Sequence, residues 1–132
     1  MSGPLIFNSR SKVRPGKLED YRAAIKVVTD LVESREPRMI AFNSYASEDG
    51  TDVSTVQVHP DAESLDTHLK IFFEEIYHAH AADALDSYEV NVFGDPSESA
   101  RQHLEQLPAM MPGVQVRILP VHHAGFLRPQ PL

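Results

Sequence analysis

The alternation of hydrophobic and polar positions predicts four β-strands in the first part of the chain. Apolar and polar side chains alternate with a period of two over residues 5–13, 39–46, 52–59 and 87–93, as expected for strands that bury one face. Between the second and third of these runs lies Ser-Glu-Asp-Gly-Thr, residues 47–51. These are turn-forming residues, so the two runs are predicted to form a β-hairpin.

Two helices are predicted between these strands. Over residues 17–35, apolar side chains recur at spacings of three and four, which gives one buried stripe: Leu18, Tyr21, Ile25, Val28 and Val32. Pro37 ends this helix because proline disfavours helical geometry at the residue before it. Asp61 is placed to cap a second helix, whose buried stripe is Leu65, Leu69, Phe72 and Ile76. The resulting order, β-α-β-β-α-β, is ferredoxin-like and belongs to the α+β class.

The C-terminal part of the chain predicts one more helix and one more strand. Gly-Asp-Pro at 94–96 interrupts the pattern, residues 97–107 form the third helix, and residues 114–119 form the fifth strand. The tail that follows is predicted to run over the surface. We therefore expect a single domain over residues 1–132, with a core at 4–94 and an extension at 95–132.

Composition and charge exclude several classes of function. The 132 residues are 42% hydrophobic and 23% charged, an ordinary globular composition, and no apolar run is long enough to cross a membrane. The formal net charge of −7 argues against a nucleic-acid partner, which requires a basic patch. The sequence contains no cysteine, which removes disulfides and thiolate chemistry. A cytoplasmic location is the expectation.

The third strand predicts which face of the sheet meets the helices. Val56 and Val58 alternate with the polar residues Thr55, Gln57 and His59. We expect the valines to pack against the helices and the polar residues to lie on the uncovered face, together with Ala41, Asn43 and Tyr45 of the second strand. This mixture of side chains is typical of a wet, partly closed cavity.

One segment of the sequence, from Val13 to Leu69, resembles a known family. It contains Val-Arg-Pro-Gly at 13–16, Glu-Pro-Arg at 36–38, Ile-Ala-Phe-Asn-Ser-Tyr at 40–45 and the segment from Val56 to the His-Leu pair at 68–69. In this order it resembles the antibiotic biosynthesis monooxygenase-like family of dimeric α+β barrels. The resemblance implies a homodimer whose two sheets enclose a cavity, with the C-terminal helix and strand able to reach across to the partner.

The activity implied by this resemblance is the cofactor-independent oxygenation of a small aromatic or polyketide-like substrate. His59 is the candidate base, standing where the family usually carries tryptophan, and Thr55, Gln57, Asn43 and Tyr45 are candidate substrate-binding residues. Relatives carry asparagine at the positions of Ser9 and Thr55. No cofactor and no metal are expected.

Two alternative functions remain open. The haem-degrading relatives place an axial histidine near His78, which makes haem a second candidate ligand, although His78 and His80 are poorly spaced on a helix to share a metal ion. The other alternative is a non-catalytic, dimeric ligand-binding barrel. His68 is expected to have a structural role, satisfied by a backbone or carboxylate partner.

Overall fold

The computed structural model describes residues 3–76, 81–111 and 113–128. The predicted elements all occur in the predicted order: β1 (Leu5–Val13), α1 (Leu18–Arg35), β2 (Ala41–Ala46), β3 (Asp52–His59), α2 (Ala62–Ile71), β4 (Leu85–Phe93), α3 (Glu98–Met110) and β5 (Gln115–Leu119). A π-helical turn, Phe72–Ile76, extends α2, and a 3-10 helix, Ala81–Ala84, precedes β4. In the described part of the chain, no helix has the length and hydropathy needed to span a membrane.

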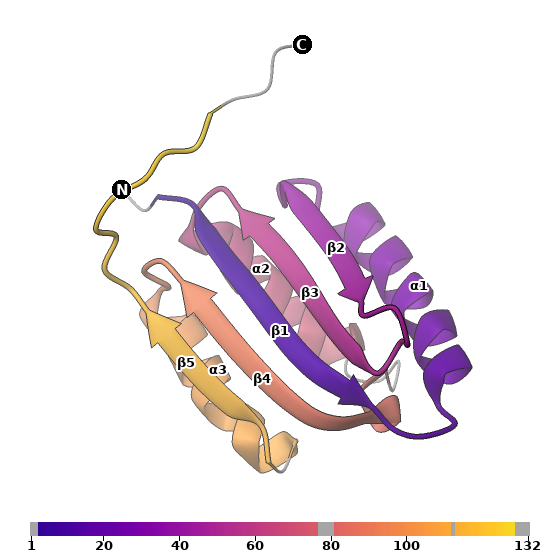
Figure 1. Ribbon diagram of the computed structural model, residues 1–132. Helices are drawn as coiled ribbons and strands as arrows, with labels where there is room; N and C mark the ends of the chain where they lie inside the picture. Colours follow the sequence, from indigo (N-terminus) through magenta and orange to yellow (C-terminus); the bar gives the residue numbers. More distant parts are fainter. Residues whose placement is uncertain (1–2, 77–80, 112, 129–132) are drawn as a thin grey trace.

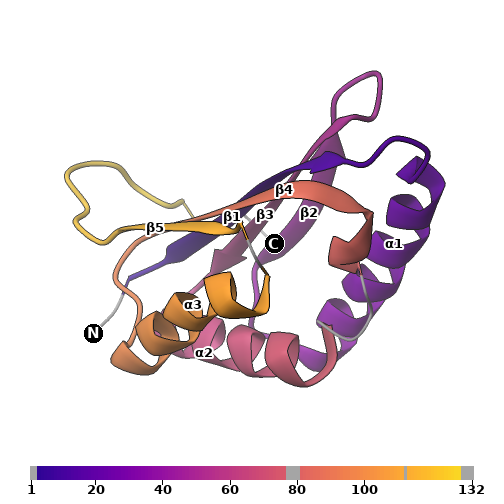
Figure 2. The same cartoon turned by 90° about the horizontal axis from the view of Figure 1, so that it is seen from below.

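The five strands form one mixed sheet in the order β2-β3-β1-β4-β5 (Figure 1). The first four are antiparallel neighbours, as the ferredoxin-like order requires, whereas β5 pairs with β4 in parallel. The fifth strand therefore extends the sheet of its own chain. Among the described residues, α1, α2 and α3 all lie on one side of the sheet and no helix covers the other side (Figure 2). We call these the covered face and the open face.

Hydrophobic side chains fill the space between the covered face and the helices. The largest cluster joins Leu5 and Val92 of the sheet to Leu65 of α2 and Leu104 of α3, all at most 1% exposed. Asp61 caps α2 as predicted, since its carboxylate accepts a hydrogen bond from the Ser64 backbone N–H at 3.0 Å. Ser97 caps α3 in the same way through its hydroxyl. The core thus fixes both helices against the sheet.

The turn between β2 and β3 is held by Asp49. Its carboxylate accepts hydrogen bonds from the backbone N–H of Thr51 and from the hydroxyls of Ser47 and Thr51, which lowers the pKa of Asp49 to about 2. Gly50 has a φ of 78°, and a Cβ there would lie 2.7 Å from Cδ2 of Leu18. The positive φ favours glycine here, and a larger residue would also require the Leu18 side chain to shift.

The prediction of which side chains face the helices was wrong. In β3, Val53, Thr55, Gln57 and His59 are buried on the covered face, whereas Val56 and Val58 are only partly buried and lie on the open face. Polar side chains of β3 point inward because they find partners there, as the site described below shows. The strand register aligns five apolar residues across the open face, and we call them the apolar row: Ala41, Val58, Ile6, Phe93 and Leu119.

Candidate functional site

The covered face and the helices enclose a cavity of about 90 Å³. Its walls combine apolar side chains with polar ones, the latter being Ser9, Ser11, Tyr21, Ser54, Thr55, Gln57, His68 and Tyr88. The cavity predicted between the two sheets of a homodimer would lie on the open face and stays a prediction, whereas this cavity lies within one chain. Ligand pockets usually have volumes of roughly 300 Å³ or more, so this cavity is smaller than most of them.

A buried histidine–glutamate pair stands at the cavity wall. Glu36 follows the last residue of α1, where Pro37 ends the helix and turns the chain back toward the protein. Its carboxylate accepts a hydrogen bond from Nδ1 of His68 on α2, with distances of 2.8 Å to Oε2 and 3.2 Å to Oε1. Both side chains are at most 4% exposed. Because a carboxylate only accepts, the Nδ1 atom carries the hydrogen and Nε2 is left as the basic nitrogen of a cavity-lining ring.

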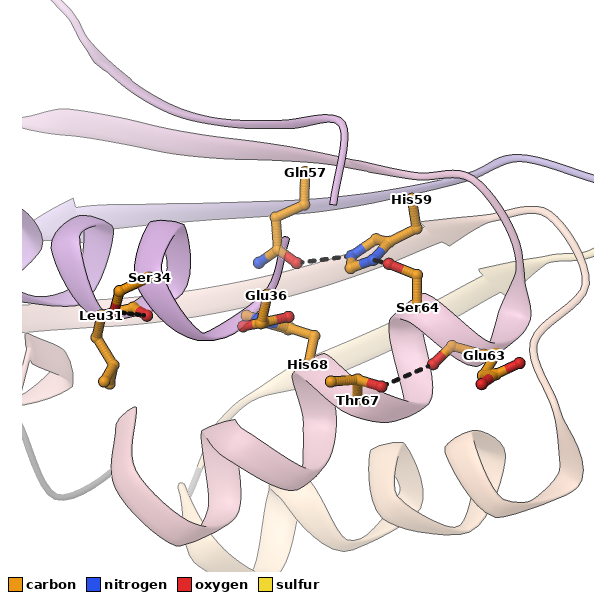
Figure 3. A network of polar contacts seen from close by, with 9 residues as sticks. All are labelled: Leu31, Ser34, Glu36, Gln57, His59, Glu63, Ser64, Thr67 and His68. Atoms are coloured by element: carbon orange, nitrogen blue, oxygen red, sulfur yellow. Dashed lines mark hydrogen bonds and ion pairs between the residues drawn. The ribbon is translucent and has the colours of Figure 1, made fainter. Parts of the chain in front are cut away.

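His59 lies behind the cavity wall and does not line it. It is fully buried, and both ring nitrogens are engaged: Nδ1 lies 2.9 Å from the Ser64 hydroxyl and Nε2 lies 3.1 Å from Oε1 of Gln57 (Figure 3). Burial, reinforced by the nearby His68, lowers the pKa of His59 to about 3. The imidazole is therefore neutral over the physiological range and has no free nitrogen. The prediction of a base at His59 finds no support in this geometry.

The structure separates the other predicted site residues into two groups. Thr55 and Gln57 line the cavity. Asn43 and Tyr45 do not, because their positions in β2 place them on the open face, where both are exposed. His78 and His80 lie outside the described residues. A carboxylate or backbone partner was predicted for His68, but Glu36 was not identified as that partner. The sequence feature that could have indicated it is the position of an acidic residue between the end of a helix and a proline.

Hydroxyl groups line another part of the cavity. The Tyr88 hydroxyl is hydrogen-bonded to the side chain of Ser9, and burial raises the pKa of Tyr88 to about 12. The Tyr21 hydroxyl lies 3.3 Å from the hydroxyl of Ser44. The Tyr88 hydroxyl therefore stays neutral near neutral pH, and all of these hydroxyl groups can donate or accept hydrogen bonds. The cavity therefore combines one basic nitrogen with several neutral hydrogen-bonding groups.

The open face carries a larger and shallower hollow of about 690 Å³. Charged residues at its base are paired within the sheet, Arg10 with Glu89 at 3.8 Å and Lys12 with Asp52 at 2.8 Å. In the described part of the chain, no group of three or more histidine or acidic side chains has the geometry of a metal site. The buried cavity is therefore the better candidate for chemistry.

Comparison with known proteins identifies the fold. No family model and no curated protein matches the sequence, but many solved structures match the fold with a probability of 1.00. MupZ from Pseudomonas fluorescens is 22% identical, covers 98% of this chain and 92% of its own, and has a TM-score of 0.68. A "putative antibiotic biosynthesis monooxygenase" from Caulobacter crescentus is 15% identical, covers 69% of this chain and 88% of its own, and has a TM-score of 0.60.

A third structure bears the same name and comes from Bacteroides thetaiotaomicron. It is 19% identical, covers 67% of this chain and 85% of its own, and has a TM-score of 0.58. At these identities the comparisons establish the fold alone, and they confirm the resemblance to the antibiotic biosynthesis monooxygenase-like domain at that level. The match to MupZ spans nearly the whole chain and therefore includes α3 and β5.

Proposed function

We propose that the protein is an enzyme in which His68 takes a proton from the hydroxyl of a small phenol or enol bound in the cavity. The observation that carries this proposal is the buried Glu36–His68 pair on the cavity wall. Glu36 holds the imidazole in one tautomer and stabilises the imidazolium that forms when Nε2 accepts the proton. A histidine held by a carboxylate in this way is a common form of general base.

The reaction proposed to follow is oxygenation without a cofactor. The deprotonated phenol transfers electrons to dioxygen, the new carbon–oxygen bond forms at a ring carbon that bears hydrogen, and loss of water leaves a quinone. Phenol and dioxygen thus give quinone and water, and the substrate supplies all the electrons. The names of the Caulobacter and Bacteroides structures support this choice among base-catalysed reactions. The neutral, mainly apolar walls favour it because they shield the anion from water.

The volume of the cavity restricts the substrate. A cavity of about 150 Å³ accommodates benzene, whereas this one measures about 90 Å³. We therefore propose a single-ring phenol or a smaller enol, and the side chains around the cavity must shift to admit a ring. This volume also supports a second candidate, a ligand-binding protein without turnover.

Oxygen uptake with a panel of single-ring phenols tests the assignment of His68. We expect the His68→Gln variant to lose at least about 100-fold in kcat, the usual contribution of a general base. The matched control is His122→Gln in the exposed tail, which should keep wild-type turnover. If the phenols bind but neither dioxygen nor phenol is consumed, the second candidate is correct. Full activity in His68→Gln would refute the base.

Haem is not part of the proposal, and neither is a metal. The candidate axial ligand His78 lies outside the described residues, and the cavity is small for a tetrapyrrole. Titration with haemin checks this: we expect no saturable Soret shift. A one-to-one shift that His78→Ala abolishes would replace the oxygenase proposal with a haem protein.

A homodimer formed through the open face is also proposed, as the family resemblance implies. The apolar row leaves Ile6 and Phe93 each 39% exposed, and Leu119 leads into a tail in which Val121 and Phe126 are 70% and 82% exposed (Figure 1). Light scattering should give the mass of two chains. Val58→Asp in the apolar row should yield monomers, whereas Lys26→Asp on the exposed side of α1 should not. A monomeric wild type would exclude the dimer.

A further inference from the structure

A chain of hydrogen bonds runs from the start of α2 to the cavity and ends at the amide of Gln57. The Ser64 hydroxyl lies 2.9 Å from Nδ1 of His59, and Nε2 of His59 lies 3.1 Å from Oε1 of Gln57 (Figure 3). All three side chains are at most 5% exposed. Ser64 is itself fixed, because its backbone N–H is bound by the capping carboxylate of Asp61. The chain of contacts is therefore rigid from the helix cap to the sheet.

The direction of each bond follows from the chemistry of the partners. An amide oxygen only accepts, so Nε2 of His59 carries the hydrogen and donates it to Gln57. In a neutral imidazole the other nitrogen is then an acceptor, so the Ser64 hydroxyl donates to Nδ1. While the Ser64 hydroxyl donates to Nδ1, Nε2 keeps its hydrogen, and a flipped Gln57 amide would then place two donors face to face. The amide nitrogen is turned away from His59 (Figure 3).

Gln57 and His68 line the same cavity. Both adjoin His59, whose ring centroid lies 5.8 Å from that of His68. The residues that line the cavity thus include a ring with an acceptor, Nε2 of His68, and an amide with a donor, the N–H group of Gln57. A phenol or enol needs this pair, because its hydroxyl gives up a proton to one and its oxygen becomes an anion that the other can bind.

We propose that the Gln57 amide is the donor that binds the phenolate or enolate oxygen formed when His68 takes the proton, and that His59 and Ser64 are positioning residues that aim this amide. The inference rests on the proposed function and deepens it. An N–H group that is already oriented stabilises the developing anion without reorganisation. The histidine that replaces the family's tryptophan thus acts through Gln57 and not as a base.

The same geometry restricts the charge of the substrate. The Glu36 carboxylate lies behind His68, and among the described residues the cavity is lined by no lysine or arginine. A ligand that brought its own carboxylate would place a second negative charge in a site without a cation. The site is therefore suited to a neutral ligand with one acidic hydroxyl group.

Binding of 4-fluorophenol, followed by ¹⁹F NMR as a function of pH, tests the inference without turnover. The fluorine shift reports the ionisation of the bound phenol. We expect the wild-type protein to lower the pKa of the bound phenol by at least one unit, and Gln57→Leu to abolish this change. Gln57→Met, which is close to glutamine in length but has no N–H group, should behave like Gln57→Leu. It provides a second variant if Gln57→Leu does not fold.

The positioning role of His59 has its own pair of variants. His59→Gln retains a donor near the position of Nε2 and should keep most of the shift in the bound phenol's pKa, whereas His59→Leu removes the donor and should lose it. In turnover, Gln57→Leu and His59→Leu should reduce kcat at least tenfold with little change in KM, because the interaction is made only with the anion. Lys26→Ala on the exposed side of α1 is the control and should change neither quantity.

The outcomes separate this inference from the function on which it rests. If the wild-type protein does not bind the phenol, the proposed function fails and the inference fails with it. A second outcome is that His68→Gln abolishes turnover while Gln57→Leu and Gln57→Met give the bound phenol the same pKa as the wild-type protein. In that case His68 is the base, but Gln57 does not bind the anion. If His59→Gln and His59→Leu lose the shift equally, His59 has only a structural role.

Discussion

The two faces of the sheet are built by the same strands and have opposite characters. On the covered face, β1 and β3 bury polar side chains such as Ser9, Thr55 and Gln57. On the open face the same strands expose Ile6 and leave Val58 partly exposed. Hydrophobicity alone therefore does not indicate which side is the interior. Polar side chains are buried where other groups can form hydrogen bonds with them. Within the described residues, no buried side-chain nitrogen or oxygen lacks a hydrogen-bond partner.

The two faces are also suited to different tasks, one to chemistry and the other to contact with another protein. The covered face combines a packed core with a cavity that holds polar groups in fixed orientations, as a site for chemistry requires. The open face has an apolar row at one end and paired charges at the other. Such a surface is suited to contact with another protein molecule. Matched substitutions on the two faces measure this contrast.

Two phenylalanines, one on each face, should show the largest difference in the free energy of unfolding that is lost on substitution by alanine. Phe7 on the covered face is 6% exposed, and Phe93 on the open face is 39% exposed. Phe7→Ala should lower the free energy of unfolding by about 3–5 kcal/mol because it leaves a cavity in the core. Phe93→Ala should lower it by less than about 1 kcal/mol. Urea unfolding at a concentration where both variants share one oligomeric state gives the comparison, and equal losses would show that the open face is as well packed as the core.

Two glutamates give the next contrast. Glu36 is buried against His68, whereas Glu89 pairs with Arg10 on the open face with both side chains more than 40% exposed. Glu36→Ala should cost about 2–3 kcal/mol, since it removes a hydrogen bond to a charged group and leaves a buried N–H unpaired. Glu89→Ala should cost less than about 0.5 kcal/mol. A loss at Glu36 no greater than at Glu89 would mean that water replaces the carboxylate and that the pair is not sealed from solvent.

The pH dependence of stability tests the burial of His59. Its pKa falls from 6.5 to about 3 on folding, so below pH 6.5 the unfolded chain binds a proton that the folded protein does not. Stability should therefore decrease as the pH falls, by about 1 kcal/mol between pH 7 and 5.5, and continue to decrease until the pH approaches the folded value. His59→Gln should remove this part of the slope in urea unfolding, whereas His122→Gln should retain it. An unchanged slope in His59→Gln would show that His59 is protonated in the folded state.

Two serines give the smallest difference. Ser9 on the covered face is hydrogen-bonded to Tyr88, and Ser87 in β4 is exposed. Ser9→Ala should cost about 0.5–1 kcal/mol, the net value of one buried hydrogen bond, and Ser87→Ala should have no measurable effect. Urea unfolding of both variants measures the difference. A neutral Ser9→Ala would show that water in the cavity takes over the hydrogen bond to Tyr88.

The elements were predictable because each is encoded locally. The spacing of Leu65 and Leu69, the cap at Asp61 and the proline at 37 act within a few residues of one another, and the structure has α1 and α2 where these signals place them. The third helix runs three residues beyond its predicted end at 107, to Met110, because Pro108 is accommodated within the helix. The π-helical turn at Phe72–Ile76 leaves no comparable mark in the sequence.

The site was less predictable because its bonds join distant parts of the chain. His68 and Glu36 are 32 positions apart, and nothing near either residue identifies the other. The valines of β3 were expected to face inward on hydrophobicity. That argument omits the hydrogen bonds His59 gains from Ser64 and Gln57, which compensate for burying it. A face assignment based on one strand cannot include partners contributed by other elements.

The turn at residues 47–51 has a consequence for how the chain folds into the native register of β2 and β3. Side chains alternate along a strand, so a hairpin that closed one residue out of step would bury Val56 and Val58 and expose Val53, Thr55 and Gln57. That misregistered hairpin would lose the cavity side chains from the interior. Asp49 and Gly50 oppose it, because their hydrogen bonds and backbone geometry close the loop at only one length. A larger residue at position 50 is therefore expected to increase the fraction of chains that fold with the cavity side chains facing outward.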